Sequence, residues 1–215
     1  MDNFGINIVV VVADGNFPVH EVPLDLLAKA EVIVCCDGSA EKVVNAGYIP
    51  NVIVGDMDSL SEELKTRFAD IIYEEKEQET NDLTKAVRWC WRSGFTDIVI
   101  IGATGMREDH TIGNISLLAE YLGDIKVRMV TDYGVFIPMK ESCRVDCVTG
   151  QQVSIFSIGE NTVITSEGLK YPLKERVLKN WWEATLNEAI SNSFGIEFRG
   201  GPIIIFLNHP ISSIQ

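Results

Sequence analysis

The chain has 215 residues, of which 46% are hydrophobic and 23% are charged, as is typical of a globular protein with a core. Asp and Glu number 31 against 18 Lys and Arg, which gives a formal net charge of −13. A chain this acidic repels the phosphate backbone of nucleic acids, and no basic stripe reverses the repulsion, so we expect no nucleic-acid partner. We also expect no membrane partner, because no apolar run approaches the roughly 20 residues that span a bilayer and the first residues lack the basic region of a secretory signal.

Short apolar runs alternate with helical patterns in the first part of the chain. The runs lie at residues 6–12, 32–36, 52–54, 71–73, 98–101 and 125–130. Apolar runs of this length, separated by helices, are typical of strands in a parallel sheet. Residues 1–132 are therefore predicted to form an α/β domain with a mostly parallel, Rossmann-like sheet that helices cover on both faces.

Two of the intervening helices have clear patterns. Over residues 81–93, apolar residues recur at i, i+3, i+4 and i+7; Thr80 or Asn81 can cap this helix and Gly94 can end it. A second helix is predicted over residues 111–122, with its apolar residues on one side.

The pattern changes from Tyr133 onward. Short runs rich in Val, Ile, Thr and Phe are separated by Gly, Asn, Ser and Pro, and they lie at residues 144–148, 152–158, 161–165 and 202–207. Few helix signals accompany them. Residues 133–215 are therefore predicted to form a second, all-β domain, an antiparallel sandwich.

The cysteine residues indicate a reducing compartment. Cys35 and Cys36 are adjacent in an apolar run, where buried free thiols are common. Cys143 and Cys147 have no second Cys or His pair close by in the sequence to complete a zinc site. We therefore expect free thiols and a cytoplasmic protein.

Polar residues follow nearly every predicted strand of the first domain, where ligands bind in an open parallel sheet. They are Asp14 and Asn16; Asp37; Asp56, Asp58 and Ser59; Glu77, Gln78 and Asp82; and Thr104, Arg107, Asp109 and His110. Carboxylates that share one edge repel each other unless they protonate, separate or share cations. Mg²⁺ prefers such oxygen ligands and bridges substrate phosphates, and an arginine binds phosphate well. The pattern predicts a metal-assisted phosphate site.

The same residues also have purely structural explanations. Asp56 and Asp58 are typical of turns. Asp82 lies in the first turn of a predicted helix, where the helix dipole stabilises a negative charge. Asp109 or Thr111 can serve as an N-cap. We favour the metal site because residues from separate strands reach one edge of the sheet.

Six short segments occur in order along the chain: CCDGSA (35–40), GDMDS (55–59), EQETNDLTKA (77–86), GATGMREDHTIGN (102–114), EGLKYPL (167–173) and Ser191–Asn192. Together they resemble the segments of the thiamine pyrophosphokinase family. The chain departs from the family pattern at Asn81, where Thr is usual, and at Glu79, where Asp is usual. Ser39 and Met106 replace glycines, and residues 174–190 match no family segment.

The resemblance implies an ATP-dependent homodimeric enzyme with active sites between its subunits. It implies that the catalytic residues are Asp56, Asp58, Asp82 and Arg107, and that the three aspartates hold Mg²⁺. The nucleotide site would comprise Asp37, Gly38, Ser59, Thr104, Arg107, Asp109 and His110. Thiamine would contact Gln78, Ser191 and Asn192.

The implied reaction is the transfer of the pyrophosphoryl group from ATP to thiamine. The hydroxyl of thiamine would attack the β-phosphorus, and AMP would leave, which requires mainly alignment and charge neutralisation from the protein. Trp182 could stack on thiamine, although packing beside the sandwich is the interpretation we favour. Two alternatives remain: a pyrophosphokinase for another primary alcohol, such as a hydroxymethylpterin, and a non-catalytic nucleotide- or thiamine-binding module.

Overall fold

The computed structural model describes residues 8–123 and 125–210, and the chain divides into two compact units. Within the described residues, the N-terminal unit extends to Leu117 and includes residues 123–132, apart from residue 124. The C-terminal unit comprises residues 118–122 and 133–210. None of the helices in the described ranges has the length and apolar character that crossing a lipid bilayer requires.

The N-terminal unit contains the predicted parallel sheet. Its strands are β1 (Val9–Val12), β2 (Val32–Cys36), β3 (Val52–Gly55), β4 (Ile72–Glu74), β5 (Asp97–Ile101) and β6 (Lys126–Val130). They lie in the order β6-β5-β1-β2-β3-β4, and each neighbouring pair is parallel. The predicted run at 6–12 begins later than expected, at Val9, and its residues 6 and 7 lie outside the described ranges.

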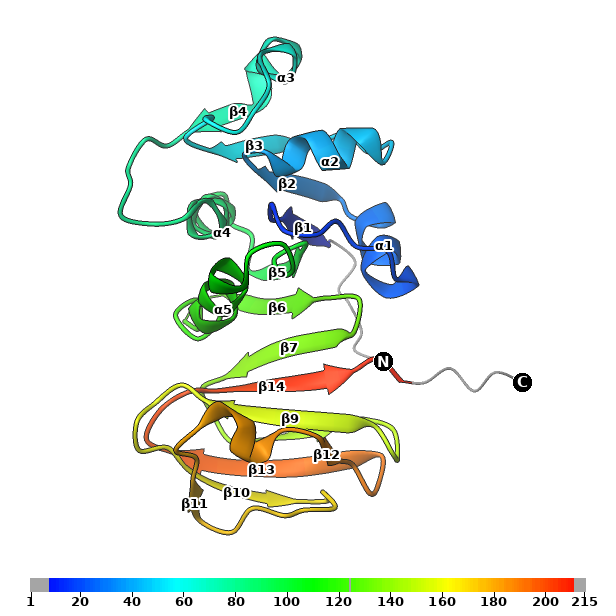
Figure 1. Cartoon of the computed structure of the whole chain (residues 1–215), viewed down its shortest axis with the longest axis vertical. Coiled ribbons are helices and arrows are strands. Elements are labelled where there is room, and N and C mark those ends of the chain that lie inside the picture. The colour runs from blue at the N-terminus through cyan, green and yellow to red at the C-terminus, as the bar shows by residue number, and fades with distance from the viewer. Residues whose placement is uncertain (1–7, 124, 211–215) are drawn as a thin grey trace, which may run out of the picture. The chain divides into compact units, whose positions relative to one another are not determined.

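Helices cover both faces of this sheet. They are α1 (Glu21–Ala28), α2 (Ser39–Asn45), α3 (Glu62–Arg67), η1 (Ala69–Ile71), α4 (Asp82–Arg92) and α5 (Glu108–Leu117). Figure 1 shows α1 and α2 on one side of the sheet and α4 and α5 on the other. This division follows from the strand order, because α1 and α2 lie in crossovers that run along the sheet from β1 toward β3, whereas α4 and α5 lie in crossovers that run the other way, from β4 to β5 and β6. Right-handed crossovers in opposite directions leave their helices on opposite faces.

The two helices with clear sequence patterns differ in how well their ends were predicted. Asn81 caps α4, with its Oδ1 accepting a hydrogen bond from the backbone N–H of Thr84 at 2.9 Å. The prediction for α5 was wrong at both ends, because the helix covers residues 108–117 instead of 111–122. Glu108 and Asp109 form its first turn, where negative charge is favoured. Neither Asp109 nor Thr111 is therefore its N-cap.

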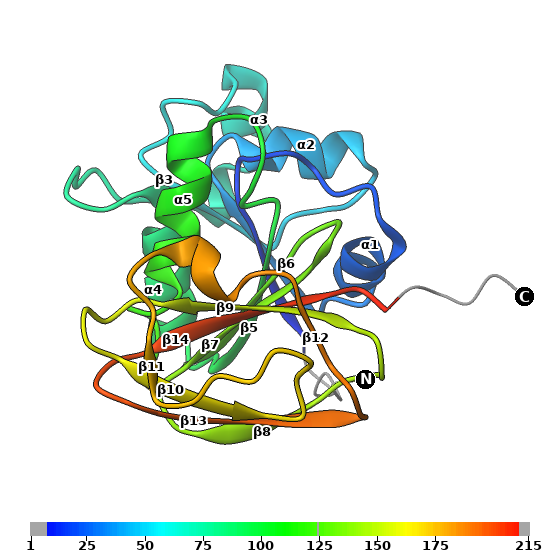
Figure 2. The ribbon, with the colours of Figure 1, turned by 60° about the horizontal axis from the view of Figure 1, so that its bottom comes forward.

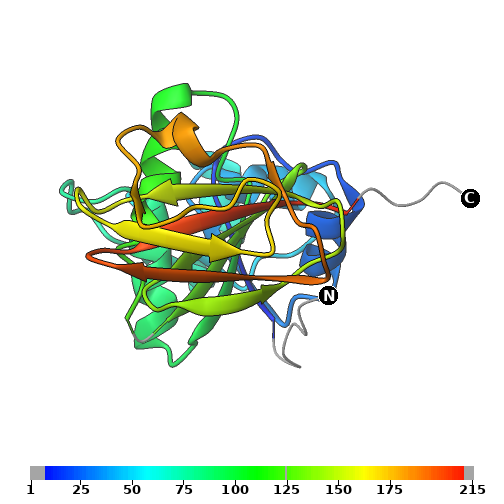
Figure 3. The same ribbon diagram turned by 90° about the horizontal axis from the view of Figure 1, so that it is seen from below.

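The C-terminal unit is built from two antiparallel sheets. Its strands are β7 (Gly134–Met139), β8 (Cys143–Asp146), β9 (Gln152–Ser157), β10 (Val163–Glu167), β11 (Arg176–Val177), β12 (Asn187–Glu188), β13 (Ser193–Arg199) and β14 (Ile203–Asn208). One sheet has the order β12-β9-β14-β7, and the other has the order β11-β10-β13-β8. Figure 3 looks onto the second sheet, with β10 and β13 in front of β9 and β14.

Alternate residues of the two sheets share one core. It includes Ile155 of β9, Ile164 of β10, Phe194 of β13 and Ile205 of β14, all 0% exposed. This alternation is typical of sheets that bury one face. The sequence interpretation did not identify β7, in which Pro138 interrupts the strand pattern.

The outer face of β9 carries the 3-10 helix η2 (Trp181–Ala184), which is visible above β9 in Figure 2. The indole of Trp181 packs edge-on against Phe156, with ring centroids 5.9 Å apart. Trp182 is 72% exposed, so the expectation that it packs beside the sandwich was wrong. A 3-10 helix of one turn directs neighbouring side chains to different sides, so of the two tryptophans it is Trp181 that contacts the sheet.

Candidate active site

A pocket of about 320 Å³ lies in the N-terminal unit, beyond the carboxyl ends of β1, β2 and β5. It is lined by Ala13, Asp14, Gly15, Cys36, Asp37, Gly38, Ser59, Asn81, Asp82, Leu83, Ala103, Gly105, Met106, Arg107, His110 and Asn114. The connections from β1 and β5 leave in opposite directions along the sheet. Their loops therefore diverge and leave a crevice, which is the usual ligand site of an open parallel sheet.

The loops after β1 and β5 are held together by backbone hydrogen bonds beyond the ends of the strands. The N–H of Gly15 donates to the carbonyl of Gly102 at 2.7 Å, and that of Asn16 donates to the carbonyl of Thr104 at 2.9 Å. A Cβ atom at Gly15 would lie 2.5 Å from both carbonyl oxygens. Only glycine permits this approach, so the floor of the pocket is fixed by the backbone.

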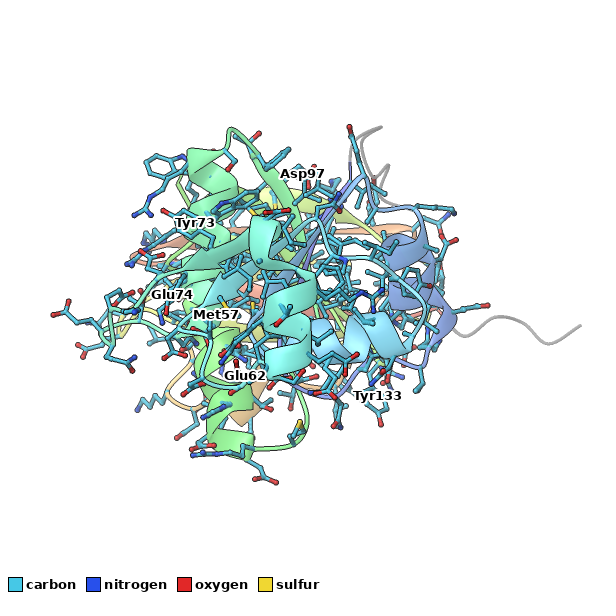
Figure 4. All side chains as sticks on the ribbon, turned by 90° about the horizontal axis from the view of Figure 1, so that it is seen from above. Met57, Glu62, Tyr73, Glu74, Asp97 and Tyr133 are labelled. Carbon is cyan, nitrogen blue, oxygen red and sulfur yellow. The ribbon has the colours of Figure 1, made fainter. Side chains whose placement is uncertain are left out.

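Three carboxylates converge beside this pocket. Asp37, Asp56 and Asp58 each place an oxygen so that the three atoms lie within 4.8 Å of one another. The loop that carries Asp56 and Asp58 follows β3, and Figure 4 locates it through Met57 and through Glu62, the first residue of α3. The convergence joins the ends of two neighbouring parallel strands, as the polar residues after each strand predicted.

Hydrogen bonds fix the geometry of the three carboxylates. Ser59 donates twice, from its N–H to Asp37 Oδ2 at 3.1 Å and from its hydroxyl to Asp58 Oδ1 at 2.9 Å. The side-chain amide of Gln78 donates to Asp56 Oδ2 at 2.9 Å. Each aspartate is therefore oriented while at least one of its oxygens can still take another partner.

Asp82, at the start of α4, lies against the same cluster. A Cβ atom at Gly55 would lie 2.8 Å from the Cβ of Asp37 and 3.2 Å from the Cγ of Asp82. Glycine at position 55 therefore allows the two aspartates to approach each other across the end of β3. The ammonium of Lys85 donates to Asp82 Oδ1 at 3.0 Å.

The environment shifts the pKa values of these carboxylates in different directions. Asp37 is 3% exposed, and burial raises its pKa to about 6, against the hydrogen bond from Ser59. Burial likewise raises the pKa of Asp82, while the hydrogen bond from Lys85 opposes the shift. The hydrogen bond from Gln78 lowers the pKa of Asp56. Desolvation thus destabilises the charge of Asp37 and Asp82 in the absence of a further cation.

The cluster fits a hard divalent cation. All its donor atoms are carboxylate oxygens, the type that Mg²⁺ and Ca²⁺ bind. Within the described residues, Asp37 Oδ1 is buried without a hydrogen-bond partner, although buried polar atoms are almost always satisfied. A cation held with Asp56 and Asp58 would satisfy this atom and oppose the rise in the pKa of Asp37.

Cationic and polar groups line the opposite side of the pocket. Arg107 donates from Nε to Asp109 Oδ1 at 3.1 Å and from Nη2 to Oδ2 at 2.6 Å, and this pair holds the pKa of Asp109 at about 2. Arg107 and His110 line the pocket, whereas Asp109 and the side chain of Thr104 are not among the lining groups. Because the pair is solvent-exposed, the guanidinium can exchange the carboxylate for a phosphate at little cost.

Sequence reasoning missed a pair of asparagines at the pocket. The Asn81 amide that caps α4 also donates from Nδ2 to Asn114 Oδ1 at 3.1 Å, and Asn114 donates to the carbonyl of Ala103 at 2.9 Å. This chain of bonds ties the start of α4, which carries Asp82, to the loop after β5. The departure from Thr at position 81 was the available signal, because an amide presents its acceptor and its donor on two separate atoms, so it can cap the helix and reach Asn114 at the same time.

Ser39 and the two C-terminal site candidates have partners of their own. The buried hydroxyl of Ser39 donates to the carbonyl of Val12 at 2.7 Å, which anchors α2 to β1. Ser191 and Asn192 belong to the C-terminal unit, between β12 and β13. Ser191 donates to the carbonyl of Ser193 at 2.7 Å, and Asn192 accepts from the hydroxyl of Thr149 at 3.4 Å.

Comparison with known proteins places both units in one family. The family model described as "Thiamin pyrophosphokinase, catalytic domain" matches residues 24–131, and the model described as "Thiamin pyrophosphokinase, substrate-binding domain" matches residues 134–206. These matches cover the exits of β2, β3 and β5, although not that of β1, and most of the two-sheet unit.

Individual relatives agree with the family models. Thiamine pyrophosphokinase 1 of Oryza sativa subsp. japonica is 30% identical over 194 residues, which cover 76% of this chain and 73% of the relative. Thiamine pyrophosphokinase of Bacillus subtilis is 31% identical over 149 residues, which cover 64% and 68% of the two chains. The crystal structure of the Bacillus subtilis thiamine pyrophosphokinase has the same fold, with a TM-score of 0.77 at 24% identity, covering 95% of this chain and 100% of that one. The chain therefore belongs to the thiamin pyrophosphokinase family, a family of ATP-dependent pyrophosphokinases.

Proposed function

We propose that the pocket of the N-terminal unit binds ATP with Mg²⁺ and that the chain transfers the pyrophosphoryl group of ATP to the hydroxyl of thiamine. The observation that carries this proposal is the convergence of Asp37, Asp56 and Asp58 beside a pocket of about 320 Å³. Four carboxylates, with Asp82, are more than nucleotide binding alone requires, because ATP is itself an anion that they repel.

In this proposal, Asp56, Asp58 and Asp82 hold Mg²⁺ as catalytic residues, and Asp37 joins them through its unpartnered oxygen. When bound, the cation would neutralise the polyphosphate. Arg107, the remaining catalytic residue, would leave Asp109 and bind the phosphates bidentately. Gly38, Ser59, Thr104, Asp109 and His110 would complete the nucleotide site through their positions at the ends of β2, β3 and β5 or at the start of α5.

The reaction needs alignment more than acid–base chemistry. An oxygen–phosphorus bond forms between the thiamine hydroxyl and the β-phosphorus of ATP, and the hydroxyl proton passes to water. The bond from that phosphorus to the oxygen shared with the α-phosphate breaks, and AMP leaves with that oxygen. Gln78, held against Asp56, would orient thiamine near the phosphates. Holding the two reacting groups in a fixed orientation supplies much of the rate enhancement in such transfers.

We further propose that residues 1–132 form the nucleotide-binding catalytic domain and residues 133–215 the thiamine-binding domain, with Ser191 and Asn192 in contact with thiamine. The active enzyme would be a cytoplasmic homodimer with active sites between its subunits. Exposed apolar side chains of the C-terminal unit support self-association, and they are Tyr171, Trp182, Leu186 and Ile190. Sedimentation of the purified chain measures this directly, and a monomer at all concentrations would contradict it.

An AMP-release assay across a panel of alcohols tests the proposed activity. We expect AMP formation from ATP only when thiamine and Mg²⁺ are both present, with loss of activity on chelation and recovery on readdition of Mg²⁺. Release with a hydroxymethylpterin but not with thiamine would assign a different acceptor. Nucleotide binding without any AMP release would identify a binding module.

A further inference from the structure

Lys85 is an unusual lysine because it is almost completely buried. It lies on α4 and is 2% exposed, and it ranks among the largest fully buried side chains of the described residues. Lysine is rarely buried unless its charge is paired. Its ammonium donates to Asp82 Oδ1 at 3.0 Å, so it faces the carboxylate cluster from inside the protein.

A carboxylate of the cluster pairs with this buried ammonium. A buried charge is stable only when an opposite charge and hydrogen bonds compensate it, and the contact with Asp82 supplies both. Lys85 therefore adds a positive charge to the acidic cluster through its contact with Asp82.

The cluster also contains an independent sign of a cation site. Asp37 is 3% exposed, and its Oδ1 atom has no partner among the described residues. Asp37 is also the residue that, with Asp56 and Asp58, offers a carboxylate oxygen to a set whose atoms lie within 4.8 Å of one another. The ammonium contacts a different member of the acidic cluster, Asp82.

We propose that Lys85 is a positioning residue that sets the charge of the cation site: it holds Asp82 in place and cancels one negative charge of the cluster from within the core. This inference rests on the cation site of the proposed function. Because a fixed positive charge near a divalent cation repels it, Lys85 weakens cation binding. The same contact orients Asp82, so Lys85 supports turnover. It touches no bound molecule itself.

Removal of the charge of Lys85 should therefore raise the affinity for a divalent cation and lower the rate of turnover. Lys85→Met keeps a long apolar stem of similar shape but removes the ammonium. We expect Mn²⁺ alone, titrated in the absence of nucleotide and followed by the electron paramagnetic resonance of free Mn²⁺, to bind at least about tenfold more tightly than to the wild-type chain. We expect kcat for AMP release to fall about tenfold or more. Damage to the fold would weaken Mn²⁺ binding as well as turnover, so tighter binding distinguishes the proposed effect from misfolding.

Two further variants control for charge and for folding. Lys85→Arg retains the charge and should restore wild-type Mn²⁺ affinity and most of the turnover. Lys29→Met removes a lysine that also pairs with an aspartate, Asp25, but is 64% exposed, and it should change neither quantity. If Lys85→Met fails to fold, the same substitution is made in a chain that already carries Asp82→Asn. The double variant should bind Mn²⁺ more tightly than Asp82→Asn alone.

The outcomes separate this inference from the proposed function. A wild-type chain that binds no Mn²⁺ would remove the cation site and, with it, the role of Lys85. A wild-type chain that binds Mn²⁺ while Lys85→Met binds it equally or more weakly would overturn the role of Lys85 alone. Tighter binding together with slower turnover, both reversed in Lys85→Arg, supports the inference.

Discussion

The strands of the two units are buried in different ways. Every residue of β1 is buried, and so are all residues of β2 except the first, whereas β13 begins with an alternation of buried and partly exposed residues. A parallel strand covered by helices on both faces leaves its side chains no access to a ligand, so polar residues gather where the strand ends. An antiparallel strand uses alternate residues for the core. In the N-terminal unit, the residues within a strand therefore stabilise the fold, and the residues just after the strand are available to bind a ligand.

The largest effect is expected on AMP release, from a substitution just after the parallel strand β3. Asp56→Asn removes one charge from the cation site while retaining the shape of the side chain. We expect AMP release to fall by about four orders of magnitude, equivalent to about 5.5 kcal/mol of transition-state stabilisation, with little change in thermal stability. The exposed Asp70→Asn is the matched control and should keep full activity. Comparable activities of the two variants would remove Asp56 from the site.

A substitution in the core of the antiparallel unit should instead lower the stability of the fold. Phe194 on β13 is 0% exposed and belongs to the core cluster to which both sheets contribute. Phe194→Ala should lower the free energy of unfolding by about 3–5 kcal/mol through lost burial and the cavity left behind. Phe194→Leu, which leaves a smaller cavity, should cost markedly less. Urea unfolding measures both, and equal losses would show that the site relaxes around the cavity.

A pH-dependent effect connects stability with the site itself. Because burial raises the pKa of Asp37 to about 6 from an ordinary 3.8, the folded chain binds a proton more tightly than the unfolded chain. The associated stability is present below about pH 4 and is lost as the pH rises through 6. Asp37→Asn should therefore stabilise the cation-free chain by about 1–3 kcal/mol at pH 7.5 and have little effect at pH 4.

Urea unfolding in the presence of a chelator measures this difference at both pH values. Added Mg²⁺ should then stabilise the wild-type chain at pH 7.5 and stabilise Asp37→Asn much less, because the cation satisfies the buried carboxylate. A stabilisation by Asp37→Asn that is equal at pH 4 and pH 7.5 would be inconsistent with a buried charge at this position.

The smallest expected effect concerns a strained residue in the loop after β5. Met106 has a φ of +58°, a left-handed conformation that glycine adopts easily and β-branched residues avoid. Met106→Ile should lower the free energy of unfolding by about 1 kcal/mol. Met106→Gly should change it by less than about 0.5 kcal/mol, because relief of strain and greater freedom of the unfolded chain oppose each other. A stable Met106→Ile would show that the loop adapts.

The fold was predictable where hydrophobic patterns were strong. The runs at 32–36 and 98–101 correspond to β2 and β5 within one residue, since strands buried on both faces are continuous in the sequence. The start of α4 was also evident from its cap. The bounds of α5 were not, because its first turn is polar and its pattern continues into residues 118–122, which belong to the other unit.

The site was predictable in its residue types and only partly in its contacts. Alternation of strands and helices requires polar residues after each strand to meet at one edge, so the sequence alone determined that Asp37, Asp56 and Asp58 should be near each other. Which oxygens converge, the burial of Lys85, and the bond between Asn81 and Asn114 were decided only by the tertiary structure. These depend on distances of a few ångströms between segments far apart in the chain, and local preference does not encode such distances because the packing of the whole unit sets them.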